Sequence, residues 1–372
     1  MTLIFWQNII SPHQLPYIKE ICNVFPDIKV LLVVEKQMAE HRKLMGWKTE
    51  AVQQRDGFKI VVNPNATQIK SLFEHNPIAQ HFFSGIRANP MVLQAFKQSL
   101  NYKVKRHLIV EGPTFYKRPR VLHLIKTFIK EKKYFNKINK VYAIGNEAKL
   151  WYETWGFSSN NIVPFSYCVE KTKSTNEVSK NLDYVPKLLF VGSLIKLKGL
   201  NQFLTVLNKL PYKVVFDIVG EGIEKENLKK IACNTTKHDI RFLGSKSNSE
   251  TRRLMCEYDC LVLPSLYDGW GAVINEALMS GLFVLCSSNC GAQQLIIDKF
   301  NGIVFSHKKK NDTYNALKYC IKNIEHIRDN KTAIKDWSTC IEGTTLAKYF
   351  VSALHTEQSI TPPWKVINSN KI

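Results

Sequence analysis

One stretch in the second half of the chain has the pattern of a buried strand, a glycine-containing loop and a helix. Residues 260–263 are four consecutive apolar residues, which is typical of a strand covered on both faces. Residues 272–280 follow with a helical pattern that stops at Gly281, a common residue after a helix. Strand, short loop and helix form the repeating unit of a parallel sheet, so this stretch predicts an α/β fold.

The loop between this strand and helix carries two glycines and lies beside two acids. Gly269 and Gly271 allow backbone N–H groups to approach a ligand closely, and the start of a helix favours negative charge. Asp268 opens the loop, and Glu276 lies one turn inside the helix with its side chain tilted back toward the loop. This arrangement suits a ligand with both phosphates and hydroxyls. The alternative is a generic strand–loop–helix unit with two solvated acids.

Strand and helix patterns alternate along both halves of the chain, as two parallel sheets require. In the first half we expect strands at residues 3–6, 28–35, 58–62, 80–83, 107–110, 141–144 and 161–166. The helices expected between them cover residues 15–24, 66–75, 90–100, 120–138 and 147–155. In the second half we expect strands at 187–191, 213–219, 240–243 and 260–263, and helices at 200–210, 225–232, from Asn248 or Ser249 to 258, 313–327 and 331–354.

A chain of 372 residues exceeds what one hydrophobic core usually serves, so two domains are expected. Residues 171–186 are polar, without an apolar period, and are predicted to be a linker. The expected organisation is a Rossmann-like domain at 1–170, a second at 187–340, and a C-terminal helix and tail at 341–372.

The net charge of +21 indicates an anionic partner: a nucleotide, a nucleic acid or an acidic membrane surface. Residues 103–140 hold twelve Lys and Arg residues and two acids, which is nearly half of the excess. The chain has no apolar run of 18 residues, and its start lacks the pattern of a signal peptide. Nine cysteines without such a signal make a disulfide framework unexpected.

The predicted helix 120–138 has a basic stripe and an apolar stripe. The basic stripe consists of His123, Lys126, Lys130, Lys133 and Lys137, and the apolar stripe of Val121, Leu124, Ile125, Phe128 and Phe135. A helix of this kind can lie on an anionic membrane. Alternatively, the apolar stripe packs on the sheet and leaves a solvated basic face. Both interpretations are compatible if the apolar stripe packs on the sheet while the lysines attract anionic lipid.

The central stretch resembles the signature of the family 4 glycosyltransferases of the GT-B fold, E-G-F-G-x-x-x-x-E-A. Here it reads Asp268-Gly269-Trp270-Gly271, then Glu276-Ala277, with Asp in place of the first Glu. Four further segments resemble other glycine motifs of that family and follow the same order along the chain. They are residues 190–199, 218–222 and 241–244, before the central stretch, and 291–302, after it. The resemblance covers residues 187–305 and implies two Rossmann-like domains that face each other across a cleft, with the last helix returning to the first domain.

The resemblance also implies roles for individual residues. Asp268 would act on the donor sugar and Glu276 on the ribose hydroxyls, while Lys198 would bind the donor diphosphate. Ser193 stands where the family has an arginine, and Lys196 is the alternative cation. The other residues assigned to the donor are Gly220, Glu221, Arg241, Leu243, Gly269, Trp270, Gly271 and Ala272.

Candidates in the first half come from the rule that ligands bind beyond the carboxyl ends of parallel strands. Glu111 ends a predicted strand and is a catalytic candidate. His13 and Gln14, in the loop after the first strand, are candidates for the acceptor side. The alternative for His13 is an ordinary surface histidine.

The expected function is a retaining, metal-independent transfer of sugar from a nucleotide-sugar donor to a saccharide or lipid-linked acceptor. No cofactor is expected, because Lys198 and the loop can neutralise the diphosphate and no D-x-D pair stands in the expected place. The family implies bacterial envelope polysaccharide synthesis in the cytoplasm, at the inner face of the membrane. One alternative is another GT-B enzyme, a sugar epimerase or a phosphorylase. The other is a basic nucleic-acid-binding protein, which the paired acids and the missing fold signatures disfavour.

Overall fold

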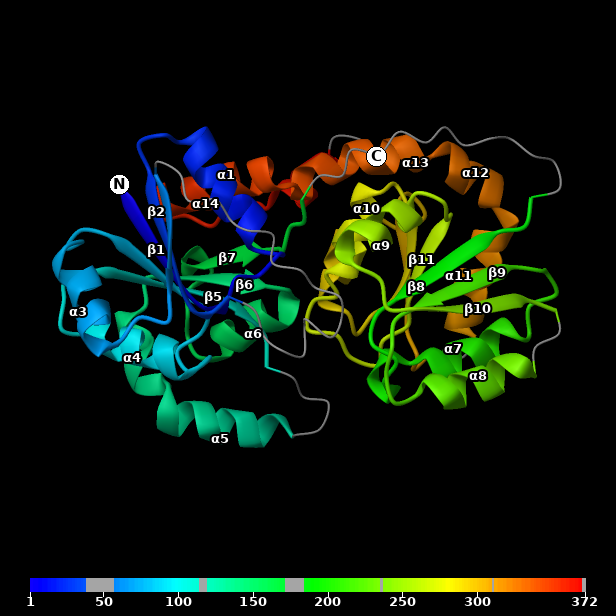
Figure 1. Ribbon diagram of the computed structural model, residues 1–372, viewed down its shortest axis with the longest axis horizontal. Helices are drawn as coiled ribbons and strands as arrows, with labels where there is room; N and C mark the ends of the chain where they lie inside the picture. Colours follow the sequence, from blue (N-terminus) through cyan, green and yellow to red (C-terminus); the bar gives the residue numbers. More distant parts are fainter. Residues whose placement is uncertain (38–56, 114–118, 171–183, 235–236, 310, 370–372) are drawn as a thin grey trace. The chain divides into compact units, whose positions relative to one another are not determined.

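The computed structural model describes residues 1–37, 57–113, 119–170, 184–234, 237–309 and 311–369, which form two compact units (Figure 1). Unit 1 contains the described residues up to 170 together with those from 340 onward. Unit 2 contains residues 184–339 apart from the gaps. Most of the predicted linker, residues 171–183, lies outside the described residues.

Unit 1 is built on a seven-stranded parallel sheet in the order β3-β2-β1-β4-β5-β6-β7. Its strands are β1 (Thr2–Ile9), β2 (Lys29–Lys36), β3 (Phe58–Val62), β4 (Gln80–Phe83), β5 (Lys105–Glu111), β6 (Lys140–Ile144) and β7 (Ile162–Phe165). Its helices are α1 (Leu15–Val24), α3 (Ala66–Glu74), α4 (Pro90–Ser99), α5 (Arg120–Lys130), η1 (Lys132–Lys137), α6 (Asn146–Thr154), η2 (Ser159–Asn161), α14 (Gly343–His355) and α15 (Pro363–Ser369).

Both faces of this sheet are buried, so its central strands are apolar at nearly every position. In β1, Ile4 and Trp6 join the core under α3 and α4, on the face opposite α1 and α14. Phe5 faces the other way and packs against Phe350 of α14, with ring centroids 5.6 Å apart. Helix α14 thereby completes unit 1, although the chain reaches it only after passing through unit 2.

Unit 2 is built on a six-stranded parallel sheet in the order β10-β9-β8-β11-β12-β13. Its strands are β8 (Lys187–Val191), β9 (Val215–Val219), β10 (Asp239–Gly244), β11 (Cys260–Leu263), β12 (Phe283–Ser287) and β13 (Gly302–Phe305). Its helices are η3 (Lys196–Lys198), α7 (Leu200–Leu207), α8 (Lys225–Cys233), α9 (Asn248–Met255), α10 (Val273–Met279), η4 (Gly291–Leu295), α11 (Asp312–Lys322), α12 (Ile324–Asp329), α13 (Lys331–Trp337) and η5 (Ser338–Ile341).

Each strand order reverses direction at one place, between β1 and β4 in unit 1 and between β8 and β11 in unit 2. The loops that follow two such strands leave the sheet toward opposite faces, which opens space for a ligand at the carboxyl edge. These two switch points are therefore where the sites should be sought.

The predicted α/β fold is confirmed, and the strands β3, β4, β8 and β11 have the predicted bounds. The predicted single helix 120–138 is wrong, because it divides at Glu131 into α5 and η1. There the backbone leaves helical geometry (φ −124°), while the Glu131 carboxylate forms an ion pair with Arg87. Tertiary pairing thus overrides a continuous helical pattern.

Two further helix predictions need correction. Residues 313–327 form two helices, α11 and α12, separated at Asn323 (φ −110°). Residues 331–354 form α13, η5 and α14, and the interruption falls where the chain passes from unit 2 to unit 1. Helix α9 is capped by Ser247 in a capping box with Glu250, one residue before the predicted cap.

A buried acid fixes the start of β11, the strand that carries the central loop. Asp259 is fully buried and accepts hydrogen bonds from the Tyr184 hydroxyl (3.0 Å) and the Lys187 backbone N–H (2.9 Å). Arg328 and Lys331 lie 3.8 and 3.6 Å from its other oxygen, and both are largely buried. The carboxylate therefore balances two buried cations.

We predict that Asp259→Ala lowers the free energy of unfolding by about 3–5 kcal/mol, because it leaves buried cations without their counterion. Asp259→Asn keeps the shape and an acceptor for the two hydrogen bonds, so its loss should be smaller. Thermal and denaturant unfolding measure both variants. An unchanged midpoint for Asp259→Ala would contradict this account of β11.

Candidate functional site

The switch point of unit 2 brings a predicted phosphate ligand and a predicted acid into direct contact. Lys198 ends η3 after β8, and Asp268 follows β11. The Lys198 Nζ donates to Asp268 Oδ2 over 2.6 Å, and the two side chains are 20% and 17% exposed. Water screens an ion pair so little exposed only weakly, so the attraction between the two charges is stronger than in an exposed pair.

A close backbone contact holds the two loops together. Gly199 has φ +69°, and a Cβ built on it would lie 2.1 Å from the Pro264 carbonyl oxygen. Any other residue would clash with that carbonyl as well as strain the backbone. The Leu266 N–H also donates to the Leu197 carbonyl (2.8 Å), so the position of Lys198 is tied to the loop after β11.

The loop that contains Asp268 is fastened on its other side to residues 289–292. Asp268 donates its N–H to the Asn289 carbonyl (3.0 Å) and accepts from the Gly291 N–H (3.1 Å). Ala292 donates to the Trp270 carbonyl (2.8 Å), and a Cβ on Gly291 would lie 2.2 Å from the Gly269 carbonyl oxygen. These contacts leave the loop little freedom.

Trp270 anchors the same loop from inside. Its side chain is 2% exposed, and its indole N–H donates to Asn275 Oδ1 over 2.8 Å. The predicted donor-binding role of Trp270 therefore rests on its backbone, because the side chain is turned into unit 2. Asn275 was not predicted, although an amide in a helix that is mostly apolar is the kind of signal that marks a buried polar contact.

Glu276 is a buried carboxyl group on α10. It is 9% exposed, and burial raises its pKa to about 7, against an opposing effect from Arg252 on α9. A carboxyl group whose pKa lies near neutral pH can lose its proton when a ligand donates hydrogen bonds to it. Sequence reasoning missed Arg252, because nothing in the sequence links α9 to this helix.

The turns after β8 and β9 also meet at this edge. A Cβ on Gly220, which has φ +139°, would lie 1.9 Å from the Gly192 carbonyl oxygen. The Leu194 N–H donates to the Glu221 carbonyl (2.8 Å), while the Glu221 carboxylate pairs with Lys225 (2.7 Å). Ser193 is half-buried in the β8 turn, whereas Lys196 is exposed.

Arg241 and Leu243 lie on the edge strand β10. The Arg241 guanidinium donates to both oxygens of the buried Asp217 on β9, over 2.7 and 2.6 Å. Because this bidentate pair raises the pKa of an already strong base, Arg241 stays charged and held to the sheet. The Arg241 side chain, predicted to contact the donor, is thus paired with Asp217 of the neighbouring strand. Leu243 is half-buried next to Gly244.

In unit 1, the predicted His13 and Gln14 follow β1, and the predicted Glu111 is the last residue of β5. The Tyr167 hydroxyl donates to Glu111 Oε1 over 2.6 Å, and the Tyr167 ring lies 5.9 Å from that of His13. Tyr167 therefore bridges two predicted residues that are far apart in sequence. Gln14 accepts a hydrogen bond from Gln7 (2.5 Å) and is buried. Tyr167 itself was not predicted.

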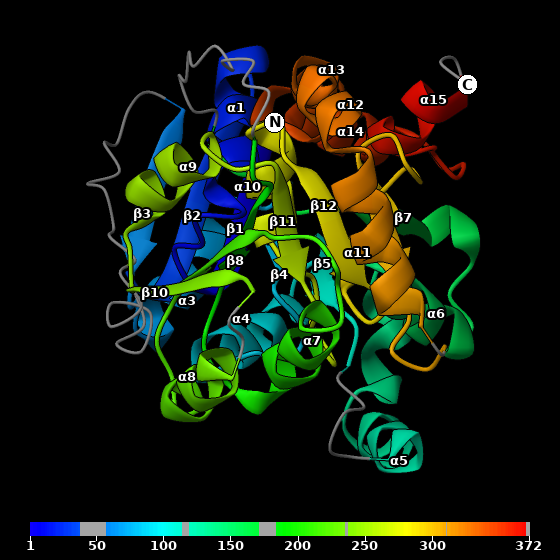
Figure 2. The same ribbon diagram turned by 90° about the vertical axis from the view of Figure 1, so that its right-hand side faces the viewer.

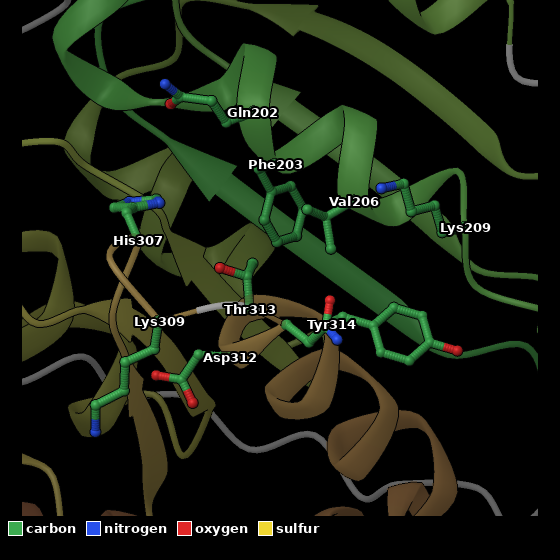
Figure 3. A pocket seen from close by; sticks show the side chains of 10 residues that line it. Gln202, Phe203, Val206, Lys209, His307, Lys309, Asp312, Thr313 and Tyr314 are labelled. Atoms are coloured by element: carbon green, nitrogen blue, oxygen red, sulfur yellow. The ribbon is translucent and has the colours of Figure 1, made fainter.

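A pocket of about 580 Å³ lies between α7 and the start of α11 (Figure 3). Phe203 and Val206 of α7 point toward Thr313 across it. His307 lines the pocket and donates from Nε2 to the carbonyl of Pro264 (3.0 Å). Pro264 is the first residue after β11. None of the residues assigned to the donor lines this pocket.

Neither a metal centre nor a membrane span is found in the part of the chain that the structure describes. Within it, no three His, Cys, Asp or Glu residues are placed to hold a metal ion. No described helix is both long and apolar enough to cross a bilayer. Metal independence remains a prediction.

Several known proteins with similar sequences are named glycosyltransferases. The family described as "Glycosyl transferases group 1" matches residues 172–337. An uncharacterized glycosyltransferase of Methanocaldococcus jannaschii is 29% identical over 204 residues, 52% of this chain and 51% of that protein. The O-antigen biosynthesis glycosyltransferase WclY of Escherichia coli is 23% identical over 326 residues, 83% and 89% of the two chains. The chain spans about half the length of several curated relatives.

Solved structures establish the architecture. HepE of Anabaena, in complex with UDP, superposes with a TM-score of 0.70 over 95% of this chain and 100% of that one, at 13% identity. The apo form of the lipopolysaccharide outer core galactosyltransferase WaaB gives 0.70 over 95% and 99%, at 14% identity. The fold is GT-B. At these identities the likeness shows the GT-B fold alone.

Within this GT-B fold, Glu276 gives a stability prediction. Its pKa of about 7 lies above the ordinary value of 4.5, so the folded state holds the proton to higher pH than the unfolded state does. The free energy of unfolding should therefore fall as pH rises from about 4.5 to about 7. Glu276→Gln avoids this loss and should be more stable by up to about 3 kcal/mol above pH 7, with no advantage below pH 4.5.

Thermal unfolding across this pH range measures the difference, with the exposed Glu325→Gln as a matched control that should show no such pH dependence. An equal gain at all pH values would mean that burial of charge is not the cause.

Proposed function

We propose that this protein is a family 4 glycosyltransferase that moves a sugar from a nucleotide-sugar donor to a saccharide or lipid-linked acceptor. The observation that carries the proposal is the contact between Lys198 and Asp268 at the unit 2 switch point, with the buried Glu276 one turn further on. A cation for phosphate, an acid for the sugar and a carboxyl group for hydroxyls match the parts of such a donor. Alignment to the group 1 glycosyltransferases covers the same unit.

Lys198 and the loop at Gly269–Gly271 would bind the diphosphate. The donor phosphates would take the place of Asp268 beside Lys198, or share Lys198 with it. In the transfer, the bond between the anomeric carbon and the diphosphate breaks, and negative charge grows on the leaving group. A preorganised cation and backbone N–H groups stabilise that charge, which is often the largest single contribution to catalysis.

Asp268 would orient the sugar and stabilise positive charge at the anomeric carbon. Glu276 would accept hydrogen bonds from the ribose hydroxyls, which donate more strongly to a carboxylate than to a neutral acid. The acceptor oxygen then forms the new bond on the same side of the sugar, which retains the configuration. We propose that no metal is needed, because Lys198 supplies the positive charge.

The acceptor side would lie in unit 1, at Glu111, His13 and Gln14. Tyr167 holds the Glu111 carboxylate, so Glu111 is a positioned acceptor for a hydroxyl proton. The relative WclY is named for O-antigen biosynthesis. We infer that this enzyme acts in bacterial envelope polysaccharide synthesis, in the cytoplasm at the inner membrane face.

We predict that Lys198→Ala weakens binding of a nucleoside diphosphate about 10- to 150-fold, since it removes a charge-assisted hydrogen bond worth about 1.5–3 kcal/mol. Binding of the nucleoside should change little. Calorimetry with UDP and uridine makes the comparison, with the exposed Lys196→Ala as the control. Equal weakening of both ligands would remove Lys198 from the phosphate site.

A screen of nucleotide sugars for hydrolysis or transfer tests the activity, and substitutions of the two acids assign their roles. Glu276→Ala should abolish transfer and leave the fold intact, because the ribose contact is lost. Asp268→Asn should lower kcat about 10²-fold or more, because it removes the charge that would stabilise the anomeric carbon. Binding of UDP should not weaken, because the lost acid competes with phosphate for Lys198. Weakened binding with an unchanged kcat would make Asp268 a binding residue.

A further inference from the structure

Helix α5 exposes an unusual concentration of large apolar side chains. Val121 is 61% exposed, Leu122 54%, Ile125 51%, Phe128 66% and Ile129 65%. These are five of the 13 large apolar side chains that are exposed in the described part of the chain. Single exposed apolar residues are ordinary on a protein surface, but a contiguous group of this size marks an interaction site.

The five side chains share one face of α5. They occupy the positions i, i+1, i+4, i+7 and i+8, which a helix places on a single side. The opposite side attaches α5 to unit 1, because Thr127 is buried and Leu124 packs against the core. The expectation that the sheet takes the apolar stripe is thus wrong for Val121, Ile125 and Phe128. Both views place α5 at the periphery of unit 1 (Figure 1, Figure 2).

Positive charge borders this apolar face. Lys126 and Lys130 are exposed on α5, and Lys132, Lys133 and Lys137 are exposed on η1 immediately after it. The helix itself contains no acid, and the nearby Glu131 is paired with Arg87. The surface therefore combines apolar side chains with a cationic border, and α5 and η1 themselves contribute no acid to balance it.

We propose that α5 inserts this apolar face into the interface of an anionic membrane, with the bordering lysines on the lipid headgroups. An interfacial helix combines these two features, apolar burial and attraction to anionic lipid. A second copy of this chain fits less well, because pairing two such faces would bring two lysine clusters together without acids. Membrane docking would bring the enzyme to a lipid-linked acceptor, so its biological purpose rests on the proposed function. Vesicle binding itself needs neither donor nor acceptor.

Flotation with phosphatidylglycerol-containing and pure phosphatidylcholine vesicles tests the docking. The parent protein should prefer the anionic vesicles. Replacing Lys126, Lys130, Lys133 and Lys137 by Gln should lower binding to them at least a hundredfold, because each lysine near the surface contributes about fivefold. The matched control replaces four exposed lysines elsewhere, Lys29, Lys213, Lys308 and Lys322, and should retain most of the binding.

The apolar face has its own variants. Phe128→Ser with Ile129→Ser should lower binding about tenfold per residue, including the part that survives high salt. Ile223→Ser is the control, because Ile223 is 89% exposed in unit 2. The chain already has seven tryptophans, so insertion is measured against the parent protein. Brominated lipid should quench a larger share of the emission in Phe128→Trp than in the parent, and no larger share in Ile223→Trp.

Two results would overturn the proposal. Vesicle binding with no more quenching in Phe128→Trp than in the parent protein would show that α5 does not insert. A dimer in sedimentation that Phe128→Ser with Ile129→Ser dissolves would show that a second copy covers the face. Calorimetry with UDP on the same variants separates this outcome from the proposed activity, because the α5 substitutions should leave nucleotide binding unchanged.

Discussion

The contact between Lys198 and Asp268 is the interaction on which the rest of the site depends. It joins the two loops that diverge at the switch point of unit 2, and the loops can meet only because Gly199 and Pro264 touch through their backbones. On its far side the Asp268 loop is bonded to residues 289–292. The candidate site is therefore organised without a bound ligand. For the proposed transfer, this would lower the entropic cost of positioning the reacting groups.

This organisation is costly to stability. Glu276 lies buried with its pKa raised to about 7, so the folded state is destabilised when the group ionises. Asp259, at the start of β11, forms ion pairs with the largely buried Arg328 and Lys331. Glu276 is a candidate for the proposed contact with a ligand, whereas Asp259 is held by its partners at the start of β11.

The sequence allowed the fold and the residues around Asp268 to be predicted, because glycine spacing and buried strands are local signals. Contacts between distant segments could not be read in this way. Tyr167 meets Glu111 across 56 positions, and Arg252 affects Glu276 from another helix. The break at Glu131 depends on Arg87, and the exposure of Phe128 depends on where α5 packs. Each of these outcomes requires the tertiary structure.

The central claim is that the unit 2 switch point binds a nucleotide through Lys198, Asp268 and Glu276. Titration of UDP by calorimetry near pH 7, in buffers of different ionisation enthalpy, tests it most directly. Ribose hydroxyls that donate to Glu276 favour its ionised form, so binding should release protons from a group with a pKa of about 7. We predict proton release on binding that Glu276→Gln abolishes. Binding with the same proton exchange in parent and variant would contradict it.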